Sequence, residues 1–369
     1  MRSKFRLVAE LVGPLAAVAI VTVYGSTMSI AQQGNVTNIL VTATIVVALY
    51  VFTGNSGVMS FGQVSFVAVG AFAAGILTSP TLSRQANMPS LFKFLGTTQI
   101  SNFDSLLLGA GLGALFALLV GVVLLRLSGL SAGIATFAVL EITYDVLSYW
   151  DKIGPGVMPV VLVPVTTTLV MGALGLGVAI AVAFAYQRTR SCRLLRATRE
   201  DAVAAQGIGI SIFQHRLIAF TISGAIAGFA GALFVHELGS ISTGQVYIDL
   251  TFATLAMLVV GGTGSLWGAV LGGIALGVLE TFLSNAENGV AIGSLHVTLP
   301  NGLSVVIVGV IMVVVLIFAP RGITGSHEFL ERFFSHGPAK TGTGTESEST
   351  AKMPDEEPPE VPLSPRPTS

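Results

Sequence analysis

Two carboxylates interrupt one of the long apolar runs of this sequence. Glu141 and Asp145 stand four residues apart in FAVLEITYDVLSYW, so a helix would present both on one face. A charged group at the centre of a membrane costs about 2.5–3.5 kcal/mol, and such groups usually face a protein interior where they mark a substrate or proton route. Tyr144, Tyr149 and Trp150 indicate a membrane–water interface near Asp145. Glu141 is therefore the deeper carboxylate and the candidate for a pathway or gating role.

Glycines and small polar residues break two other apolar runs. The first break lies in TGNSGVMSFGQVSF from Thr53, and the second in LVVGGTGSLWGAVLGG from Leu258. Backbone that leaves the helix at membrane depth survives only where protein buries it or where it lines a wet cavity. Paired breaks in the two halves of a chain indicate a translocation pathway, although small residues also serve close helix packing. Both interpretations stay open for the predicted pathway residues, which besides Glu141 are Ser56, Ser60, Gly62, Gln63, Gly261, Gly262, Gly264 and Ser265.

A charged segment with small residues, RATREDAVAAQGIGI from Arg196, lies between two apolar runs. It predicts a short helix with a nearly bare Ala/Gly face, which Gly209 is suited to end. Such a helix can dock in a groove of a partner. Alternatively, the arginines belong to a basic solvated loop on the cytoplasmic side. The predicted docking residues are Arg199, Glu200, Asp201, Ala204, Ala205 and Gly209.

Signatures of catalysis and of metal binding are absent from the sequence. It contains no Walker A pattern, no HExxH and no GxSxG motif, and its five histidines are scattered. Cys192 is the only cysteine, which excludes a disulfide within the chain. The sequence therefore predicts no catalytic residue, no metal and no cofactor. The formal net charge of −1 gives no indication of a nucleic-acid partner.

The elements that must position these residues are membrane helices. Of 369 residues, 52% are hydrophobic and 10% charged, against about a quarter charged in an ordinary soluble protein. Apolar runs reach the roughly 18 residues that cross a bilayer. We predict an all-α, polytopic transmembrane bundle of about ten spans, some of them broken, near 8–30, 36–53, 64–79, 104–125, 130–149, 160–187, 216–237, 249–262, 265–283 and 302–319.

The distribution of basic residues predicts which loops are cytoplasmic. Arg2, Lys4 and Arg6 place the N-terminus inside, ahead of an uncleaved first helix. Ten crossings then put loop 188–216, with its six arginines, and the C-terminus inside as well. Residues 337–369 are rich in Pro, Thr, Ser and Glu, which predicts a disordered cytoplasmic tail after a transmembrane domain over 1–336.

Three sequence blocks and a short C-terminal motif resemble the LivM-type permeases of branched-chain amino acid ABC importers. GNSGVMSFGQVSFVAVGAFAAGIL is similar to the early block of that family, and LVVGGTGSLWGAVLGG to its late block. REDAVAAQGIGI followed by LIAFTISGAIAGFAGALF is similar to its cytoplasmic loop and next helix. IFAPRGI matches the motif with which the sequences of this family usually close. The resemblance spans about 36–324 and identifies the chain as a member of this family.

The resemblance implies four kinds of partner. These are cytoplasmic ABC ATPase subunits, a second LivH-type permease, an extracytoplasmic substrate-binding protein and the lipid bilayer. Residues 199–209 then match the "EAA" coupling loop that sits in a groove of the ATPase. The chain departs from the family pattern at Ala202, where an acidic residue is common, and in WDKIGPGVMPV, which lacks the usual threonine of a glycine block.

The leading prediction is the permease subunit of an ATP-driven importer for branched-chain or other small aliphatic amino acids, located in the cytoplasmic membrane and not itself an enzyme. A second possibility is the same transporter type with urea or a short amide as cargo. A third is a proton-coupled secondary transporter with Glu141 as the proton site.

Overall fold

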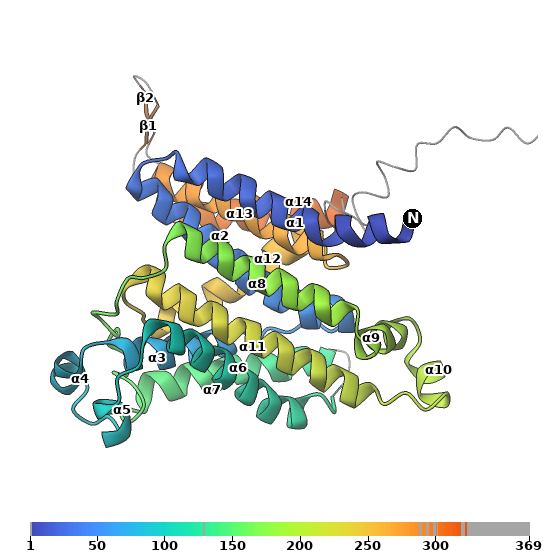
Figure 1. Ribbon diagram of the computed structural model, residues 1–369, viewed down its shortest axis with the longest axis horizontal. Coiled ribbons are helices and arrows are strands. Elements are labelled where there is room, and N and C mark those ends of the chain that lie inside the picture. Colours follow the sequence, from blue (N-terminus) through green and yellow to red (C-terminus); the bar gives the residue numbers. More distant parts are fainter. Residues whose placement is uncertain are drawn as a thin grey trace, which may run out of the picture.

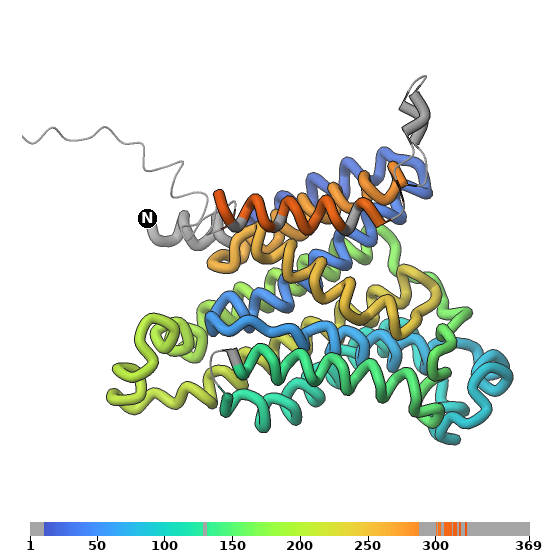
Figure 2. The backbone as a smooth tube through the Cα atoms, turned by 180° about the vertical axis from the view of Figure 1, so that it is seen from behind, coloured from blue at the N-terminus to red at the C-terminus, as the bar shows by residue number. Residues whose placement is uncertain are grey.

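The computed structural model describes residues 2–127, 130–287, 290–292, 295–297, 300, 302–318 and 322. These residues form a bundle of helices with one short antiparallel hairpin at its edge (Figures 1 and 2), which confirms the predicted all-α class. The predicted tail, 337–369, lies outside the described residues. The elements are α1 (Arg2–Ser26), α2 (Ile30–Ser56), α3 (Gln63–Thr78), α4 (Thr81–Asn87), α5 (Lys93–Thr97), α6 (Asn102–Leu124), α7 (Leu130–Tyr149), α8 (Leu169–Gln187), α9 (Arg190–Glu200), α10 (Ala202–Gly207), α11 (Ile212–Leu238), the 3-10 helix η1 (Thr243–Val246), α12 (Ile248–Gly261), α13 (Leu266–Glu287), β1 (Val290–Ile292), β2 (Leu295–Val297) and α14 (Leu303–Phe318).

The described helices confirm several membrane spans but not the predicted number of about ten. Six are long and apolar enough to cross a bilayer, namely α2, α6, α8, α11, η1 with α12, and α13. A seventh is added if α3 and α4, which meet at an angle of 112°, count as one broken span. The apolar parts of α1 and α14 are shorter, at Leu11–Ser26 and Val306–Val315. Two carboxylates interrupt the apolar sequence of α7.

The predicted span 160–187 is only partly helical, because α8 begins at Leu169. Pro164 has no N–H to donate and disfavours a helical residue before it, which keeps the segment before Leu169 extended. Val160 instead forms an antiparallel bridge with Ile241, and the N–H of Val163 donates to the carbonyl of Gly239 at 3.0 Å. This segment therefore covers the end of α11 instead of crossing with α8.

The core lies around α2 and α11. Every residue of α2 from Ile39 to Ser56 is buried, and α11 packs on α2, α3 and α6. Glycines bring α6 and α11 close together: a Cβ built on Gly228 would lie 2.1 Å from the carbonyl oxygen of Gly109. Close approach through small residues is the usual packing of membrane helices. The long helices therefore form one tightly packed body.

The bundle has two distinct ends (Figure 1). Helices α9 and α10 lie at one end, where α1 begins, and we call this the α9/α10 end. Helices α4 and α5 and the β1–β2 hairpin lie at the other, which we call the α4/α5 end. Helix α2 runs from the α4/α5 end to the α9/α10 end. Residues at its two termini therefore belong to opposite surfaces of the bundle.

Candidate functional site

Helix α9 is fastened to the last turns of α2 by a polar network centred on two buried residues of α2, Asn55 and Tyr50. The side-chain oxygen of Asn55, which is 0% exposed, accepts hydrogen bonds from Arg196 Nε at 2.8 Å and from Cys192 Sγ at 3.2 Å. The hydroxyl of Tyr50 accepts from Gln187 Nε2 at 2.6 Å and from Arg196 Nη2 at 3.3 Å. Buried polar groups need such partners, so this network fixes the position of α9 on α2.

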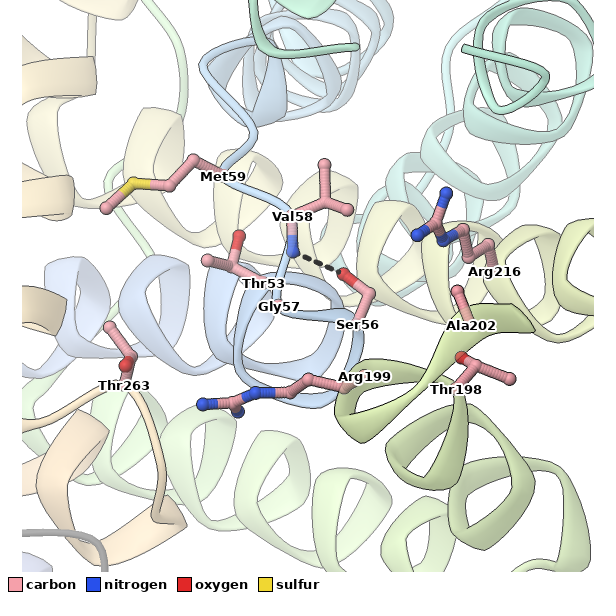
Figure 3. Close-up of a pocket in the computed structure, with 10 residues that line it drawn as sticks. All are labelled: Thr53, Ser56, Gly57, Val58, Met59, Thr198, Arg199, Ala202, Arg216 and Thr263. Carbon is pink, nitrogen blue, oxygen red and sulfur yellow. Dashed lines mark hydrogen bonds between the residues drawn. The ribbon is translucent and has the colours of Figure 1, made fainter. Parts of the chain in front are cut away.

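Arg199 extends this contact along the last turn of α2. Its Nη1 donates to the carbonyl oxygen of Gly54 at 3.0 Å. Its aliphatic part covers Gly57, where a Cβ would meet Arg199 Cγ at 3.0 Å; Gly57 adopts φ +71° and ends α2. Figure 3 shows the side chain lying along the end of α2. Arg199, predicted to dock on a partner, thus contacts the broken region between α2 and α3.

A first cavity of about 410 Å³ opens beside this contact. The end of α2, helices α9 and α10, the start of α11 and the α12–α13 turn surround it (Figure 3). Two guanidinium groups and several hydroxyls give it a polar, cationic character. Of the residues predicted from sequence, it brings together Ser56 and Arg199. The full lining is Thr53, Ser56, Gly57, Val58, Met59, Thr198, Arg199, Ala202, Arg216 and Thr263.

Two of the predicted docking residues, Asp201 and Ala205, have roles in the structure of the loop itself. Asp201 caps α10, because its Oδ1 accepts from the N–H groups of Val203 and Ala204, both at 2.9 Å. Ala205 is 5% exposed and faces the protein. The sequence spacing alone could not show that Asp201 caps α10 or that Ala205 is buried.

The outer face of α10 is apolar and bare. Val203 is 80% exposed and Ile208 is 78% exposed, and Ala204 and Glu200 are exposed beside them. Gly209 adopts φ +82° with open space where a Cβ would stand. Large exposed apolar residues on a short helix outside the bundle indicate an interaction surface. We call the set Val203, Ala204 and Ile208 the α10 tip.

The break between α2 and α3 is exposed at Gly57 and Met59 and buried from Ser60 on, apart from the half-buried Phe61. Gly62 lies against α7, where a Cβ would be 2.4 Å from the carbonyl oxygen of Thr136. Gln63 Nε2 donates to the hydroxyl of Ser223 on α11. Ser60 is buried, and its hydroxyl has no hydrogen-bond partner in the structure. Of the predicted residues in this break, Ser60, Gly62 and Gln63 line neither cavity described here.

The glycine block between α12 and α13 serves close packing. A Cβ on Gly261 would lie 2.0 Å from the carbonyl oxygen of Gly268, so the two helices touch there. Gly262 adopts φ +116°, which favours glycine. Ser265 starts α13 by accepting from the N–H of Gly268 at 2.9 Å, and Gly264 is exposed. The packing interpretation thus has direct geometric support at Gly261.

Glu141 links α7 to the start of α12. Its carboxylate accepts a hydrogen bond from the hydroxyl of Tyr247, whose ring stacks on Tyr144 with centroids 4.0 Å apart. Glu141 is half-buried and Asp145 is exposed. Glu141 lines neither of the two cavities.

A second cavity of about 700 Å³ lies toward the α4/α5 end, between the first half of α2, the end of α11, the η1–α12 segment, the second half of α13, and α14. Sequence reasoning missed it, because its lining comes from five separate segments. One signal was available: Glu280 interrupts the apolar run of α13 as Glu141 interrupts that of α7. Its polar lining residues are Asn35, Asn38, Thr42, Gln245, Asp249, Glu280, Thr281, Ser284 and Asn285.

Comparison with known proteins places these features in context. The family model described as "Branched-chain amino acid transport system / permease component" matches residues 33–316. The permease LivM of Escherichia coli is 32% identical over 131 residues, which are 36% of this chain and 28% of LivM. BraD of Pseudomonas aeruginosa is 33% identical over 168 residues, 46% of this chain and 48% of BraD.

The relatives are not confined to one cargo. The autoinducer 2 import permease LsrC of an Enterobacter species is 34% identical over 102 residues, 26% of this chain and 29% of LsrC. The match thus spans less than half the length of these relatives. No solved structure matches the chain. On the family match over residues 33–316, the chain belongs to the permease components of branched-chain amino acid transport systems.

Proposed function

We propose that this chain is the membrane-spanning permease subunit of an ATP-driven importer for branched-chain or other small aliphatic amino acids. Residues 1–336 form the permease domain in the cytoplasmic membrane, with both termini and the coupling loop 188–216 on the cytoplasmic side. ATPase subunits, a second permease of the LivH type and a substrate-binding protein complete the transporter. The chain contributes no catalytic residue, since the ATPase subunits hydrolyse ATP.

The observation that carries this proposal is the construction of the coupling loop. Helix α10 exposes an apolar tip, and α9 behind it is bonded to the end of α2 through Asn55 and Tyr50. A partner that moves the α10 tip would move α9, and α9 carries Arg199 onto the break between α2 and α3. Within the loop, the α10 tip is thus the docking element, and Arg196 and Arg199 are the residues that transmit its motion.

The test is a double substitution in the α10 tip, Val203→Glu with Ile208→Glu. Burying one large apolar side chain contributes about 1.5–3 kcal/mol, so losing two weakens ATPase binding by at least about 100-fold. The transporter is reconstituted with its ATPase, its second permease and its binding protein. We expect the variant to lose both co-purification with the ATPase and ATP-driven uptake of L-leucine.

The matched control is Leu82→Glu, which also replaces an exposed apolar residue but lies on α4 at the opposite end of the bundle. It should co-purify with the ATPase like the unchanged protein. Undiminished ATPase binding in the α10 tip variant would show that the ATPase docks elsewhere.

The cargo and the energy source are tested in the same vesicles. L-leucine, L-valine, urea and a short amide are compared as cargo, and so is autoinducer 2 because LsrC is among the relatives. Uptake that persists without the ATPase but collapses with the proton gradient would favour the secondary transporter with Glu141 as the proton site. We expect uptake to stop when the ATPase is omitted.

A further inference from the structure

We propose that the second cavity is the site through which the cargo enters the permease, and that its two carboxylates select a cargo with a free ammonium group. This inference rests on the proposed function and names the chemical group of the cargo that the permease itself recognises. The carboxylates are Asp249 on α12 and Glu280 on α13. Urea, simple amides and other neutral solutes lack the group that they recognise.

The charge of the cavity has one sign. Both Asp249 and Glu280 line it and are exposed to it, and no Lys, Arg or His is among the lining residues. Within the part of the chain that the structure describes, neither carboxylate has a hydrogen-bond or ion-pair partner. A cleft lined by one sign of charge between low-dielectric walls concentrates ligands of the opposite sign.

An unpartnered hydroxyl in the cavity wall also points to a ligand. Thr42 is only 7% exposed and lines the cavity from α2, and its hydroxyl makes no hydrogen bond within the described residues. Buried polar groups in proteins nearly always have a partner, so an unused hydroxyl facing a cavity is a candidate ligand contact. Asn38 lies one turn earlier on the same face, and its Nδ2 donates to Glu237 at 3.2 Å, which holds its side-chain oxygen in place.

The remaining lining suits a small amphipathic molecule. Ile39, Phe234, Leu250 and Met257 provide an apolar wall, and the cavity volume of about 700 Å³ lies within the range of about 300–1,000 Å³ common for small-molecule sites. An ammonium group would face Asp249 and Glu280 while an aliphatic side chain packs on the apolar wall. An aliphatic amino acid has both parts.

The test uses charge-matched thiol reagents on the complete transporter in vesicles. Ala253→Cys places a thiol in the cavity one helical turn after Asp249. The native Cys192 is buried at the other end of the bundle, and its labelling is measured in the parent protein and subtracted. The probes are the cationic reagent MTSET and the anionic reagent MTSES. Ala86→Cys, at an exposed site on α4 outside the cavity, gives the reference ratio of the MTSET and MTSES labelling rates.

We expect the MTSET/MTSES ratio at Ala253→Cys to exceed that at Ala86→Cys by about tenfold or more, because the cavity concentrates cations. Glu280→Gln or Asp249→Asn should reduce this excess, and the second variant covers a failure of the first to fold. L-leucinamide, which keeps the ammonium group, should slow the labelling. 4-Methylpentanoate, which lacks it, should not.

Equal ratios at the two sites, a ratio unchanged in both variants, or equal protection by the two ligands would each overturn the inference. These readouts need neither ATP nor uptake, so they separate this inference from the proposed function. If the unchanged transporter showed no ATP-driven uptake, the proposed function would fail while the labelling result stood. If uptake of L-leucine were intact in Glu280→Gln with Asp249→Asn, only the present inference would fail.

Discussion

The polar network between α9 and α2 can be tested with the only cysteine of the chain. Cys192 lies on the buried face of α9, where its thiol donates to Asn55, and burial raises the pKa of that thiol. Its reaction with a maleimide therefore requires α9 to lift from α2. We choose Asn55→Ala as the perturbation, because it removes the acceptor that binds both Arg196 and Cys192.

The expected magnitude follows from the bond that is lost. A hydrogen bond to a charged group contributes about 1.5–3 kcal/mol, and because Arg196 is itself exposed the low end applies. A loss of about 1.5 kcal/mol raises the open fraction of α9 about tenfold. The labelling rate of Cys192 should rise by the same factor, because local opening precedes the reaction.

The assay compares maleimide labelling of the native permease with that of protein unfolded in SDS, which corrects for any change in the thiol itself. Asn87→Ala is the control, since it makes the same substitution at an exposed position on α4. In the complete transporter we also expect Asn55→Ala to carry fewer substrate molecules per ATP hydrolysed. A labelling rate equal to that of the unchanged protein would show that this network does not hold α9 on α2.

Three further outcomes are expected. Gly228→Ala should lower the free energy of unfolding in detergent by about 1–3 kcal/mol, because its Cβ would clash with a backbone carbonyl of α6, whereas Gly111→Ala, with open space around it, should change the thermal midpoint little. Arg84→Leu should make residues 88–100 more sensitive to protease, because the buried guanidinium donates to two carbonyls of that loop. Tyr247→Phe removes the hydrogen bond to Glu141 and should leave the pH profile of uptake unchanged; a shifted profile would support Glu141 as a proton site.

Local signals in the sequence were sufficient for much of the fold. The glycines at 57 and 62 bound the break between α2 and α3, because a helix end and a close helix contact both favour glycine. The extended segment before α8 was not predicted, since hydropathy alone cannot show that Val160 pairs with Ile241. The prolines at 159 and 164 carried a signal against helix there, which the apolar composition outweighed.

The site was less accessible to sequence reasoning, because the direction of each side chain depends on tertiary contacts. Ala204 and Ala205 are adjacent and chemically identical, yet the first is exposed on the α10 tip and the second is buried. Arg199 fits a docking surface by composition, but it lies on Gly54 because α9 is bonded to α2. The cavity around Glu280 could not be predicted from the sequence, since its walls come from segments that are far apart along the chain.

The two cavities share the wall formed by α2, which gives α10, at one end of the bundle, a route by which to act on the distant second cavity. Thr42 lines the second cavity and Thr53 the first, so about 16 Å of helix separates them at 1.5 Å per residue. Every residue of α2 between them is buried, so close packing separates the two cavities along this helix. Opening a path along this wall requires α2 to move against its neighbours. The end of α2 is held by α9, so a displacement of the α10 tip acts on the helix that lines both cavities.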